Sequence, residues 1–428
     1  MKKVSLVSLG CEKNLVDSEH ILGLLQHDGY EITNSLEDSD IIFVNTCGFI
    51  TPSKKESIEA IFNALSLGKQ VVVTGCLVQR YEENLKKEIP EANYIAIRDY
   101  DHFNELLSKI DPNLTEKGGL KDEYRIVSTG DFSAYLRIGD GCDNCCTYCA
   151  IPLIRGKYQS RKYDDIINEA KELALRGYKE LIVLEQDTTK YGSDLSEGHD
   201  IVSLLKGLLK IEELDYIRLL YLYPDEISNE LIELIASEER LTPYFDIPIQ
   251  HSESHILKAM NRRGDKEFLL NLFKKIKEKV PNAILRTTIM VGFPGESEED
   301  VDNLIDFINE VQFDHLGVFT YSKEEGTKSY NFPNQIKESV KNLRKRKVMK
   351  AQQVISYRKN KSQIGKEMTG LIVGTSKQYY LFRSYWNAPD GIDGNIYIKS
   401  NKLLNLGDKV TVKITDASIY DLYGELID

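Results

Sequence analysis

The stretch AYLRIGDGCDNCCTYC, residues 134–149, joins a strand-like run to four cysteines within eight positions. Cys142, Cys146 and Cys149 form the pattern C-x3-C-x2-C, and Cys145 is left over. A zinc ribbon separates its two C-x-x-C pairs by about 15 to 20 residues, whereas here the two pairs are adjacent. Soft thiolates also bind iron–sulfur clusters, and three thiolates leave one iron of a four-iron cluster open. The spacing therefore favours an iron–sulfur cluster with an open iron.

The run at 134–141 is the first of six strand-like runs that alternate with helical stretches. This alternation predicts an α/β fold with a parallel sheet, and six such units predict a partial (β/α) barrel. Functional groups of a barrel lie at the carboxyl ends of its strands, so the four cysteines are expected there. The five later runs are LIVLEQD, YIRLLYLY, YFDIPIQ, ILRTTIMVGF and HLGVFTYS.

The first hundred or so residues show a strand–helix rhythm of their own, which predicts an open parallel sheet with helices on its faces. Three runs, KKVSLVSL, DIIFVNT and QVVVTG, are followed closely by Cys11, Cys47 and Cys76. Carboxyl ends of parallel strands share one edge, where ligands bind. Packing cysteines would fall inside the strands, so we favour ligands over inert core residues for these three positions.

The end of the chain changes character, because residues 362–428 read as short strands broken by Gly, Asn and Asp. This pattern predicts a small all-β barrel or sandwich. The sequence thus predicts three domains: an α/β domain at 1–125, the barrel domain at 130–361 and the β domain at 362–428.

Composition fits a globular protein with 41% hydrophobic and 29% charged residues, and no apolar run approaches the roughly 20 residues of a membrane span. The start, MKKVSLVSLGC, imitates a lipoprotein signal, but only ten residues precede Cys11, fewer than the usual 15 to 30 or so. We therefore expect a cytoplasmic protein without a membrane partner. In that reducing compartment, clustered cysteines are more often metal ligands or catalytic groups than disulfides.

The formal charge of −12 argues against a long nucleic acid as the main partner. One stretch is an exception to this acidic character, since KNLRKRKVMK at 341–350 has six basic residues in ten. A solvated face of a connecting helix is favoured there over a phosphate-binding patch.

Tyr148 stands before the last cysteine, and with it C-x3-C-x2-C resembles the signature of radical S-adenosylmethionine enzymes. SLGCEKNLVDSE, VNTCGFI, TGCLVQRY and GCDNCCTYCAIPLIRGKYQSR extend the resemblance to the methylthiotransferases over nearly the whole chain. It implies a radical-SAM barrel, a TRAM-like C-terminal barrel and S-adenosyl-L-methionine as cofactor. It also implies two 4Fe–4S clusters, one on Cys11, Cys47 and Cys76 and one on Cys142, Cys146 and Cys149.

Two branches of that family differ in substrate: adenosine in transfer RNA, or the β-carbon of an aspartate in small-subunit ribosomal protein S12. LEQDTTKYG and FDIPIQHSESHILKAMNRRG resemble the second branch, and the Gln-x-Asn typical of the first is replaced by Glu12, Lys13 and Asn14. An acidic chain also suits a basic ribosomal protein, free or on the small subunit. Transfer RNA remains the alternative substrate, and a non-catalytic iron–sulfur protein the alternative class.

Further partners follow from the same resemblance. An electron donor such as flavodoxin or ferredoxin is expected to reduce the enzyme. If RNA is contacted, the C-terminal domain or the basic helix is the expected place, although the C-terminal domain has seven Lys/Arg against eight Asp/Glu.

Four side chains are candidates for binding the S-adenosylmethionine cofactor. Tyr148 lies within the cysteine motif, and Gln186 and Asp187 follow a barrel strand where the family contacts the cofactor's polar groups. The alternative for Asp187 is a helix N-cap. Arg286 is expected to pair with the cofactor's carboxylate, or else to form a structural ion pair.

Three other features are open to simpler interpretations. Cys145 stands where the family usually has a residue other than cysteine. We interpret it as a residue that does not bind the cluster rather than as an alternative ligand, because both assignments would use the same iron. Ser297 and Asp300 are placed like a capping box after a tight turn. His251 is either near the active site or an ordinary hydrogen-bonded histidine.

Overall fold

The computed structural model describes residues 2–112, 114, 118–130 and 132–427. The chain forms two compact units, of which the first comprises residues 1–128, 139–159 and 322–330 and the second comprises the rest. The segment that carries the four clustered cysteines thus packs with the N-terminal residues. This division cuts across the domain boundaries expected from sequence, which follow the order of the chain.

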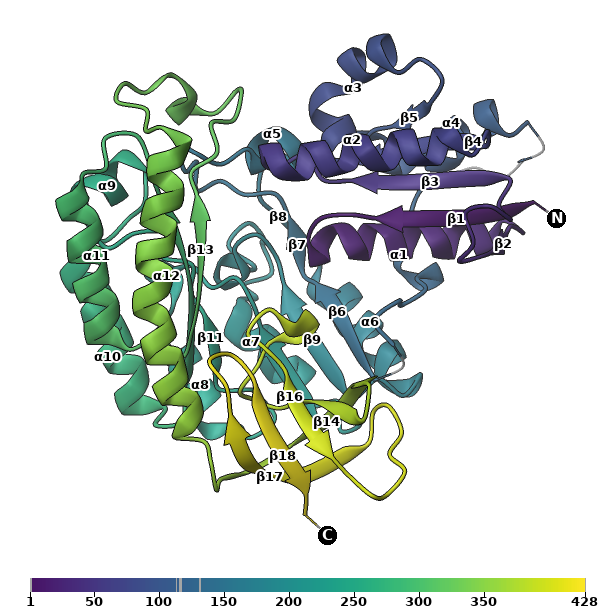
Figure 1. Cartoon of the computed structure of the whole chain (residues 1–428). Coiled ribbons are helices and arrows are strands. Elements are labelled where there is room, and N and C mark those ends of the chain that lie inside the picture. Colours follow the sequence, from purple (N-terminus) through teal and green to yellow (C-terminus); the bar gives the residue numbers. More distant parts are fainter. Residues whose placement is uncertain (1, 113, 115–117, 131, 428) are drawn as a thin grey trace. The chain divides into compact units, whose positions relative to one another are not determined.

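The first unit is built on a parallel five-stranded sheet with the order β2-β1-β3-β4-β5 (Figure 1). The order reverses between β1 and β3, and ligands of open α/β sheets bind outside the carboxyl ends of the strands at such a switch point. The predicted N-terminal parallel sheet is confirmed. Its strands are β1 (Lys3–Ser8), β2 (Glu31–Ile32), β3 (Ile41–Thr46), β4 (Gln70–Gly75) and β5 (Asn93–Ile95).

Helices cover both faces of this sheet, with α1 and α2 on opposite sides (Figure 1). Ile41 and Phe43 of β3 pack into a core with α1 and α4. The alternate residues Ile42 and Val44 pack into a second core with α2 and α3. Side chains alternate across a strand, so a strand buried on both faces reads as a continuous apolar run. The helices are α1 (Glu12–His27), α2 (Thr51–Ser66), α3 (Cys76–Glu88) and α4 (Phe103–Ile110).

The second unit contains six parallel barrel strands in two three-stranded sheets, β10-β9-β6 and β11-β12-β13. A parallel bridge between Ile217 and Leu241 leads from the first sheet toward the second. The predicted partial (β/α) barrel is confirmed. Its strands are β6 (Ser133–Arg137), β9 (Glu180–Leu184), β10 (Tyr216–Leu219), β11 (Tyr244–Asp246), β12 (Ile284–Val291) and β13 (His315–Thr320).

Helices follow the barrel strands, and the predicted capping box at the start of α11 is confirmed. The Asp300 amide donates to Ser297 Oγ at 3.1 Å, and the Ser297 amide donates to the Asp300 carboxylate at 2.7 Å. This exchange satisfies backbone donors that the first turn leaves open. The helices are α6 (Tyr163–Leu175), α7 (Ile201–Leu208), α8 (Asn229–Ser237), α9 (Ser254–Ala259), α10 (Lys266–Lys279), α11 (Glu298–Val311) and α12 (Glu338–Lys361).

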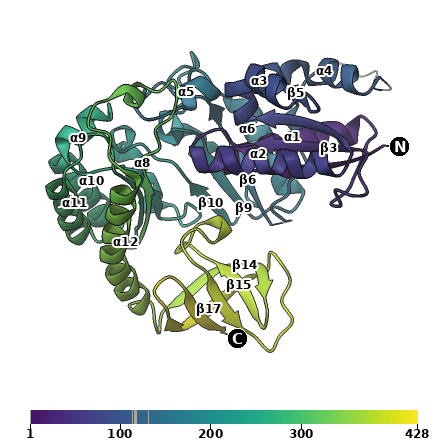
Figure 2. The same ribbon diagram turned by 45° about the horizontal axis from the view of Figure 1, so that its top comes forward.

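The C-terminal strands close into a barrel with the order β14-β15-β16-β18-β17, which decides between the barrel and the sandwich (Figure 2). Arg383 of this barrel joins the carboxylate of Glu180, which Arg218 also contacts, and all three side chains are buried. The small barrel therefore belongs to the second unit. Its strands are β14 (Glu367–Ser376), β15 (Tyr379–Arg383), β16 (Ile396–Lys399), β17 (Lys409–Ala417) and β18 (Leu422–Leu426).

Across the described residues, no helix is both long enough and apolar enough to cross a membrane.

Candidate functional site: two sets of cysteines

The three N-terminal cysteines lie at the carboxyl ends of three neighbouring strands. Cys11 lies shortly after β1, at the N-cap position of α1. Cys47 comes directly after β3, and Cys76 follows β4 as the first residue of α3. Because β1, β3 and β4 are adjacent in the sheet, these turns meet at one edge. We call Cys11, Cys47 and Cys76 the strand-end set.

Two glycines allow the turns that carry this set to pack directly against each other. A Cβ atom on Gly10, whose φ is +97°, would lie 3.0 Å from Cys47 Cβ. A Cβ atom on Gly48 would lie 2.6 Å from the carbonyl oxygen of Cys76, which is closer than real Cβ contacts. Only glycine fits such an approach. The turn of Cys11 therefore packs against the Cys47 side chain, and the turn after Cys47 packs against the Cys76 backbone.

Side chains from the flanking helices hold these turns in place. The Cys47 amide donates to Ser57 Oγ of α2 at 3.0 Å, and this hydroxyl donates back to the Cys47 carbonyl oxygen at 3.0 Å. Asn14 of α1 donates to the Leu9 carbonyl oxygen at 2.5 Å. Its Oδ1 accepts from Cys76 Sγ at 3.8 Å. The set is thus supported by rigid elements on both faces of the sheet.

Arg155 is a neighbour of the strand-end set that the sequence analysis did not single out. Its buried guanidinium lies 2.6 Å from the Asp17 carboxylate and 3.2 Å from that of Asp140. It also donates to Cys76 Sγ at 3.8 Å. Arg155 follows the clustered cysteines closely in the chain, so it connects their segment to Cys76. Its place in IPLIRG gave no periodic or spacing signal that could have indicated this contact.

Burial keeps the thiols of Cys47 and Cys76 protonated in the metal-free chain. It raises the pKa of Cys76 to about 12, an effect that Arg155 opposes and Cys11 and Cys47 reinforce. Burial likewise raises the pKa of Cys47. Thiols must lose their protons to bind metal, so a positively charged metal centre would displace these protons when it binds. Three thiols with a neighbouring guanidinium fit an iron–sulfur cluster.

The clustered cysteines lie in a loop between β7 (Gly139–Asp140) and the short helix α5 (Ile151–Ile154). The Cys149 amide donates to the Cys146 carbonyl oxygen at 3.0 Å, and the Ile151 amide lies 3.5 Å from Cys149 Sγ as a donor. Amides directed at sulfur suit a thiolate that binds iron. We call Cys142, Cys146 and Cys149 the loop set.

Cys145 differs from the other members of this loop. It is exposed, whereas Cys142, Cys146 and Cys149 are half-buried, and its φ of 51° is left-handed. Cys145 thus differs from the three loop-set cysteines in both exposure and backbone conformation. All seven cysteines fall within the described residues, and none of them forms a disulfide.

The distances between the cysteine sulfurs help to distinguish an iron–sulfur cluster site from a site for a single zinc ion. Among the described residues, the one group of three ligand atoms within 4.8 Å of one another is Glu253, His255 and Asp300, so neither cysteine set is that compact. Zn–S bonds of about 2.3 Å would hold sulfurs within about 4.6 Å of each other. The group at Asp300 has a simpler role, because that carboxylate caps α11 and His255 is largely exposed.

A second loop, residues 322–330, fastens the loop set within the first unit. The Ser329 amide donates to the Thr147 carbonyl oxygen at 2.8 Å. At the other end, the buried Glu324 carboxylate pairs with Arg80 of α3 at 3.1 Å and with Lys54 of α2 at 2.7 Å. One loop thus contacts both the cysteine loop and the helix that begins at Cys76. Sequence reasoning missed Glu324 because its partners are distant in the chain.

The four candidates for cofactor binding fall in different places. Tyr148 lies half-buried in the cysteine loop, and Gln186 and Asp187 lie just past the carboxyl end of β9, after Glu185. Asp187 Oδ1 accepts from Thr189 Oγ1 at 2.7 Å, and it precedes a 3-10 turn without a side-chain cap bond. These three residues remain predictions for the cofactor site.

Arg286 lies near the amino end of β12, away from the end where a barrel places its active site. Its guanidinium pairs with Asp246 at 2.5 Å and with Asp393 of the small barrel at 3.3 Å. This geometry supports the structural ion pair, the alternative that the sequence left open. His251 is fully buried, and its Nδ1 accepts from the Glu253 amide at 3.0 Å.

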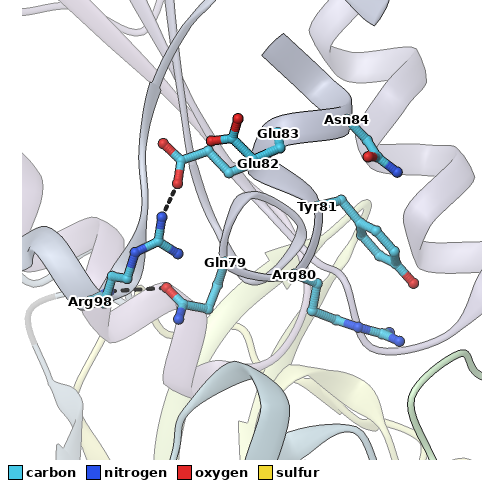
Figure 3. A pocket seen from close by; sticks show the side chains of 7 residues that line it. All are labelled: Gln79, Arg80, Tyr81, Glu82, Glu83, Asn84 and Arg98. Carbon is cyan, nitrogen blue, oxygen red and sulfur yellow. Dashed lines mark hydrogen bonds and ion pairs between the residues drawn. The ribbon is translucent and has the colours of Figure 1, made fainter. Parts of the chain in front are cut away.

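A polar hollow of about 200 Å³ lies beside α3 (Figure 3). The helix is kinked at Tyr81, where φ and ψ are −133° and 23°. Arg98 reaches across to Glu82, and its backbone amide donates to Gln79 at 3.0 Å. These groups are hydrogen-bonded or paired with one another, and no cysteine lines the hollow. We therefore interpret the hollow as a consequence of the kink in α3 rather than as a binding site. Its lining residues are Gln79, Arg80, Tyr81, Glu82, Glu83, Asn84 and Arg98.

Three family models match successive parts of the chain. Residues 3–96 match "Uncharacterized protein family UPF0004", residues 136–308 match the radical SAM superfamily, and residues 364–427 match the TRAM domain. The first range contains the five-stranded sheet and the third contains the small barrel, while the second covers the large barrel from the end of β6 through β12.

Full-length relatives decide the family. The ribosomal protein uS12 methylthiotransferase RimO of Thermoanaerobacter sp. (strain X514) is 46% identical over 437 residues, which cover 99% of this chain and 100% of the relative. The protein of the same name from Aquifex aeolicus (strain VF5) is 47% identical over 99% of this chain and 96% of its own length. The chain belongs to the RimO family of methylthiotransferases. It is therefore a radical SAM methylthiotransferase enzyme.

Solved structures agree at the level of the fold. The radical S-adenosylmethionine methyltransferase TsrM from Kitasatospora setae superposes with a TM-score of 0.56 at 15% identity, over 74% of this chain and 73% of TsrM. OxsB, a cobalamin-dependent S-adenosylmethionine radical enzyme, gives 0.52 at 12% identity, over 83% of this chain and 56% of OxsB. At such identities the likeness concerns the fold alone.

Proposed function

We propose that this enzyme inserts a methylthio group at the β-carbon of an aspartate in ribosomal protein S12. The observation that carries the proposal is the arrangement of two separate three-thiol sets within one compact unit of a RimO-family chain. The relatives are named for their action on uS12, and the acidic charge of −12 is complementary to a basic ribosomal protein.

We further propose that each set holds one 4Fe–4S cluster, so that both clusters have an open iron. When bound, the two clusters and S-adenosylmethionine supply the radical chemistry at the loop set and a place for the transferred sulfur at the strand-end set. A fully ligated electron carrier would need a fourth protein ligand in each set. The exposed, left-handed Cys145 is a poor fourth ligand.

The chain's own residues orient and isolate this chemistry. The strand-end set is fixed by Ser57 and Asn14, and Arg155 places a buried positive charge beside Cys76. We assign contacts with the cofactor's polar groups to Tyr148 in the cysteine loop and to Gln186 and Asp187 at the carboxyl end of β9. Electrons would come from a donor such as flavodoxin or ferredoxin.

The test is an anaerobic reaction of the reconstituted enzyme with S-adenosylmethionine, a reductant and sulfide. A peptide carrying the S12 loop and, separately, transfer RNA are offered as substrates, and the products are weighed. A methylthio mass gain on the aspartate peptide alone is expected. A gain on transfer RNA alone would overturn the substrate assignment, and no 5'-deoxyadenosine from enzyme with loaded clusters would overturn the radical mechanism.

A further inference from the structure

The long helix α12 is far more basic than the rest of the chain. Its 24 residues include nine Lys or Arg side chains and a single acidic one, Glu338, in a protein of net charge −12. A helix whose charges served only the fold would pair them with the abundant carboxylates around it. The pairing of each cation therefore distinguishes structural charges from charges available to a partner.

Four of the nine cations do serve the fold. Arg344 is buried against Glu296 and Glu298, and Lys341 is buried, with its Nζ donating to the Tyr321 carbonyl oxygen at 2.8 Å. The other two are closer to the surface, where Lys347 pairs with Asp302 and Lys359 pairs with Asp314. These contacts fasten α12 to α11 and to the loop before β13.

The remaining cations point to solvent. Lys345, Arg346, Lys350 and Arg358 are exposed, and in the described part of the chain no carboxylate lies within ion-pair distance of any of them. Lys361 is also exposed and lies 4.8 Å above the ring of Tyr357. An acidic protein thus leaves a row of cations on one helix without counter-charges.

Most of these cations lie in one outward stripe of the helix. Arg346, Lys350, Tyr357 and Lys361 follow one another at spacings of four, seven and four residues, which places them on one face. The stripe also exposes Val354, of which 70% is accessible. Figures 1 and 2 show α12 on the outside of the second unit, with α11 at its side. We call Arg346, Lys350, Val354, Tyr357, Arg358 and Lys361 the basic stripe.

We propose that the basic stripe is a docking surface for the phosphate backbone of small-subunit ribosomal RNA. This inference rests on the proposed function, because RNA surrounds a ribosomal protein in the assembled subunit. Cations one helical turn apart, about 5.4 Å, present a regular row to a polyphosphate strand. An exposed tyrosine with a lysine above its ring adds the combination of aromatic and basic groups found in nucleic-acid interfaces. The stripe then strengthens the binding of the enzyme to S12 in an RNA-containing particle, beyond what the free protein offers.

The charge distribution favours this helix over the small barrel as the electrostatic anchor. From residue 362 onward the chain has seven Lys/Arg against eight Asp/Glu. Two of those basic side chains are engaged, since Arg383 pairs with Glu180 and Lys409 with Asp215. Binding through α12 predicts a strong dependence on salt, because counterions are released from each contacted phosphate.

The experiment compares two triple variants of the full-length enzyme. The test variant is R346Q/K350Q/R358Q, which removes three cations of the basic stripe. The matched control, K171Q/K206Q/K210Q, removes three exposed lysines near α6 and α7 for which the described residues provide no ion pair. Both variants change the net charge equally. Sedimentation with purified small subunits and with naked small-subunit RNA gives the affinity at several salt concentrations.

The expected result is an affinity at least about tenfold weaker for the test variant, with a salt slope lower by about 2 to 3. The control should bind like the wild type, and all three proteins should modify a free S12 peptide equally. Equal binding by both variants would overturn the inference. Unchanged RNA binding with impaired reduction by flavodoxin would also overturn it, in favour of an acidic redox protein. If the wild type modifies no form of S12, the proposed function fails, while the binding comparison still decides the role of the stripe.

Discussion

The strand-end set and the loop set provide three thiols each by different structural means. Cys47 and Cys76 are buried at the ends of adjacent strands, in turns that glycines allow to touch. Cys142, Cys146 and Cys149 are half-buried in an irregular loop held by backbone hydrogen bonds and by residues 322–330. The first arrangement depends on the sheet, and the second depends on local spacing.

Because of this difference, the geometry of each set depends on different parts of the chain. A set built on strand ends is supported by two helical layers and by Arg155, so its geometry depends on residues distant in sequence. The loop set is held instead by local backbone hydrogen bonds and by residues 322–330. The first is suited to holding a fixed centre, and the second to chemistry on a molecule that enters and leaves.

The largest expected effect is the loss of the loop set by Cys146→Ala. It should abolish formation of 5'-deoxyadenosine, a larger loss than the roughly 10- to 100-fold typical of outer-shell residues. Cys145→Ala is the matched control and should retain cleavage, because Cys145 is exposed and left-handed. Chromatographic assay of 5'-deoxyadenosine measures both variants. Loss of cleavage in Cys145→Ala would contradict the assignment of the loop set.

A smaller effect is expected from Arg155→Met, which leaves the buried Asp17 without its cation. Removing one partner of a buried ion pair costs about 3 to 5 kcal/mol in the free energy of unfolding. The control Arg98→Met removes a half-exposed arginine paired with Glu82 and should cost no more than about 1 kcal/mol.

Urea unfolding of the metal-free chain measures both costs. Adding Asp17→Asn to Arg155→Met should recover part of the loss, because the uncompensated charge is then removed. Equal stability of the Arg155 and Arg98 variants would show that the buried pair does not support the strand-end set.

The smallest expected effect concerns the chemical reactivity of the thiols and does not involve the catalytic activity. Burial raises the pKa of Cys76 to about 12, so almost no thiolate is present at pH 7. Alkylation of Cys76 by iodoacetamide should therefore be slow in the reduced, metal-free chain and should rise about tenfold for each pH unit up to about pH 11. Mass spectrometry of the peptides follows the reaction, with the exposed Cys145 as the reference. Equal rates for the two at pH 7 would contradict the buried geometry.

Periodicity predicted the fold well because each region has a regular pattern. β3 is buried on both faces and begins with the continuous apolar run IIFV. The two-residue strand β2 (Glu31–Ile32) was not predicted, since so short a segment carries no period. It matters nevertheless, because it places the switch point between β1 and β3.

The site was predictable where chemistry is local in the sequence. The spacing of the loop set and the strand ends before Cys11, Cys47 and Cys76 indicated both sets. The packing of residues 139–159 with the N-terminal unit was not predictable, because it depends on Arg155 and Glu324, whose partners lie far along the chain.

Arg286 shows the complementary limit. An arginine on a barrel strand is compatible with cofactor binding or with an ion pair, and the choice depends on which end of the strand it occupies. Its place near the amino end of β12, with Asp246 and Asp393 as partners, is determined by the tertiary structure. No periodicity in ILRTTIMVGF distinguishes the two.

The most direct test of two clusters on two sets is the iron content of the reconstituted enzyme, measured with Mössbauer spectroscopy. We predict about eight irons per chain in the wild type and about four in C11A/C47A/C76A, as two 4Fe–4S clusters require. That variant should still cleave S-adenosylmethionine but transfer no methylthio group. About four irons in the wild type, or unchanged iron in the triple variant, would contradict the account.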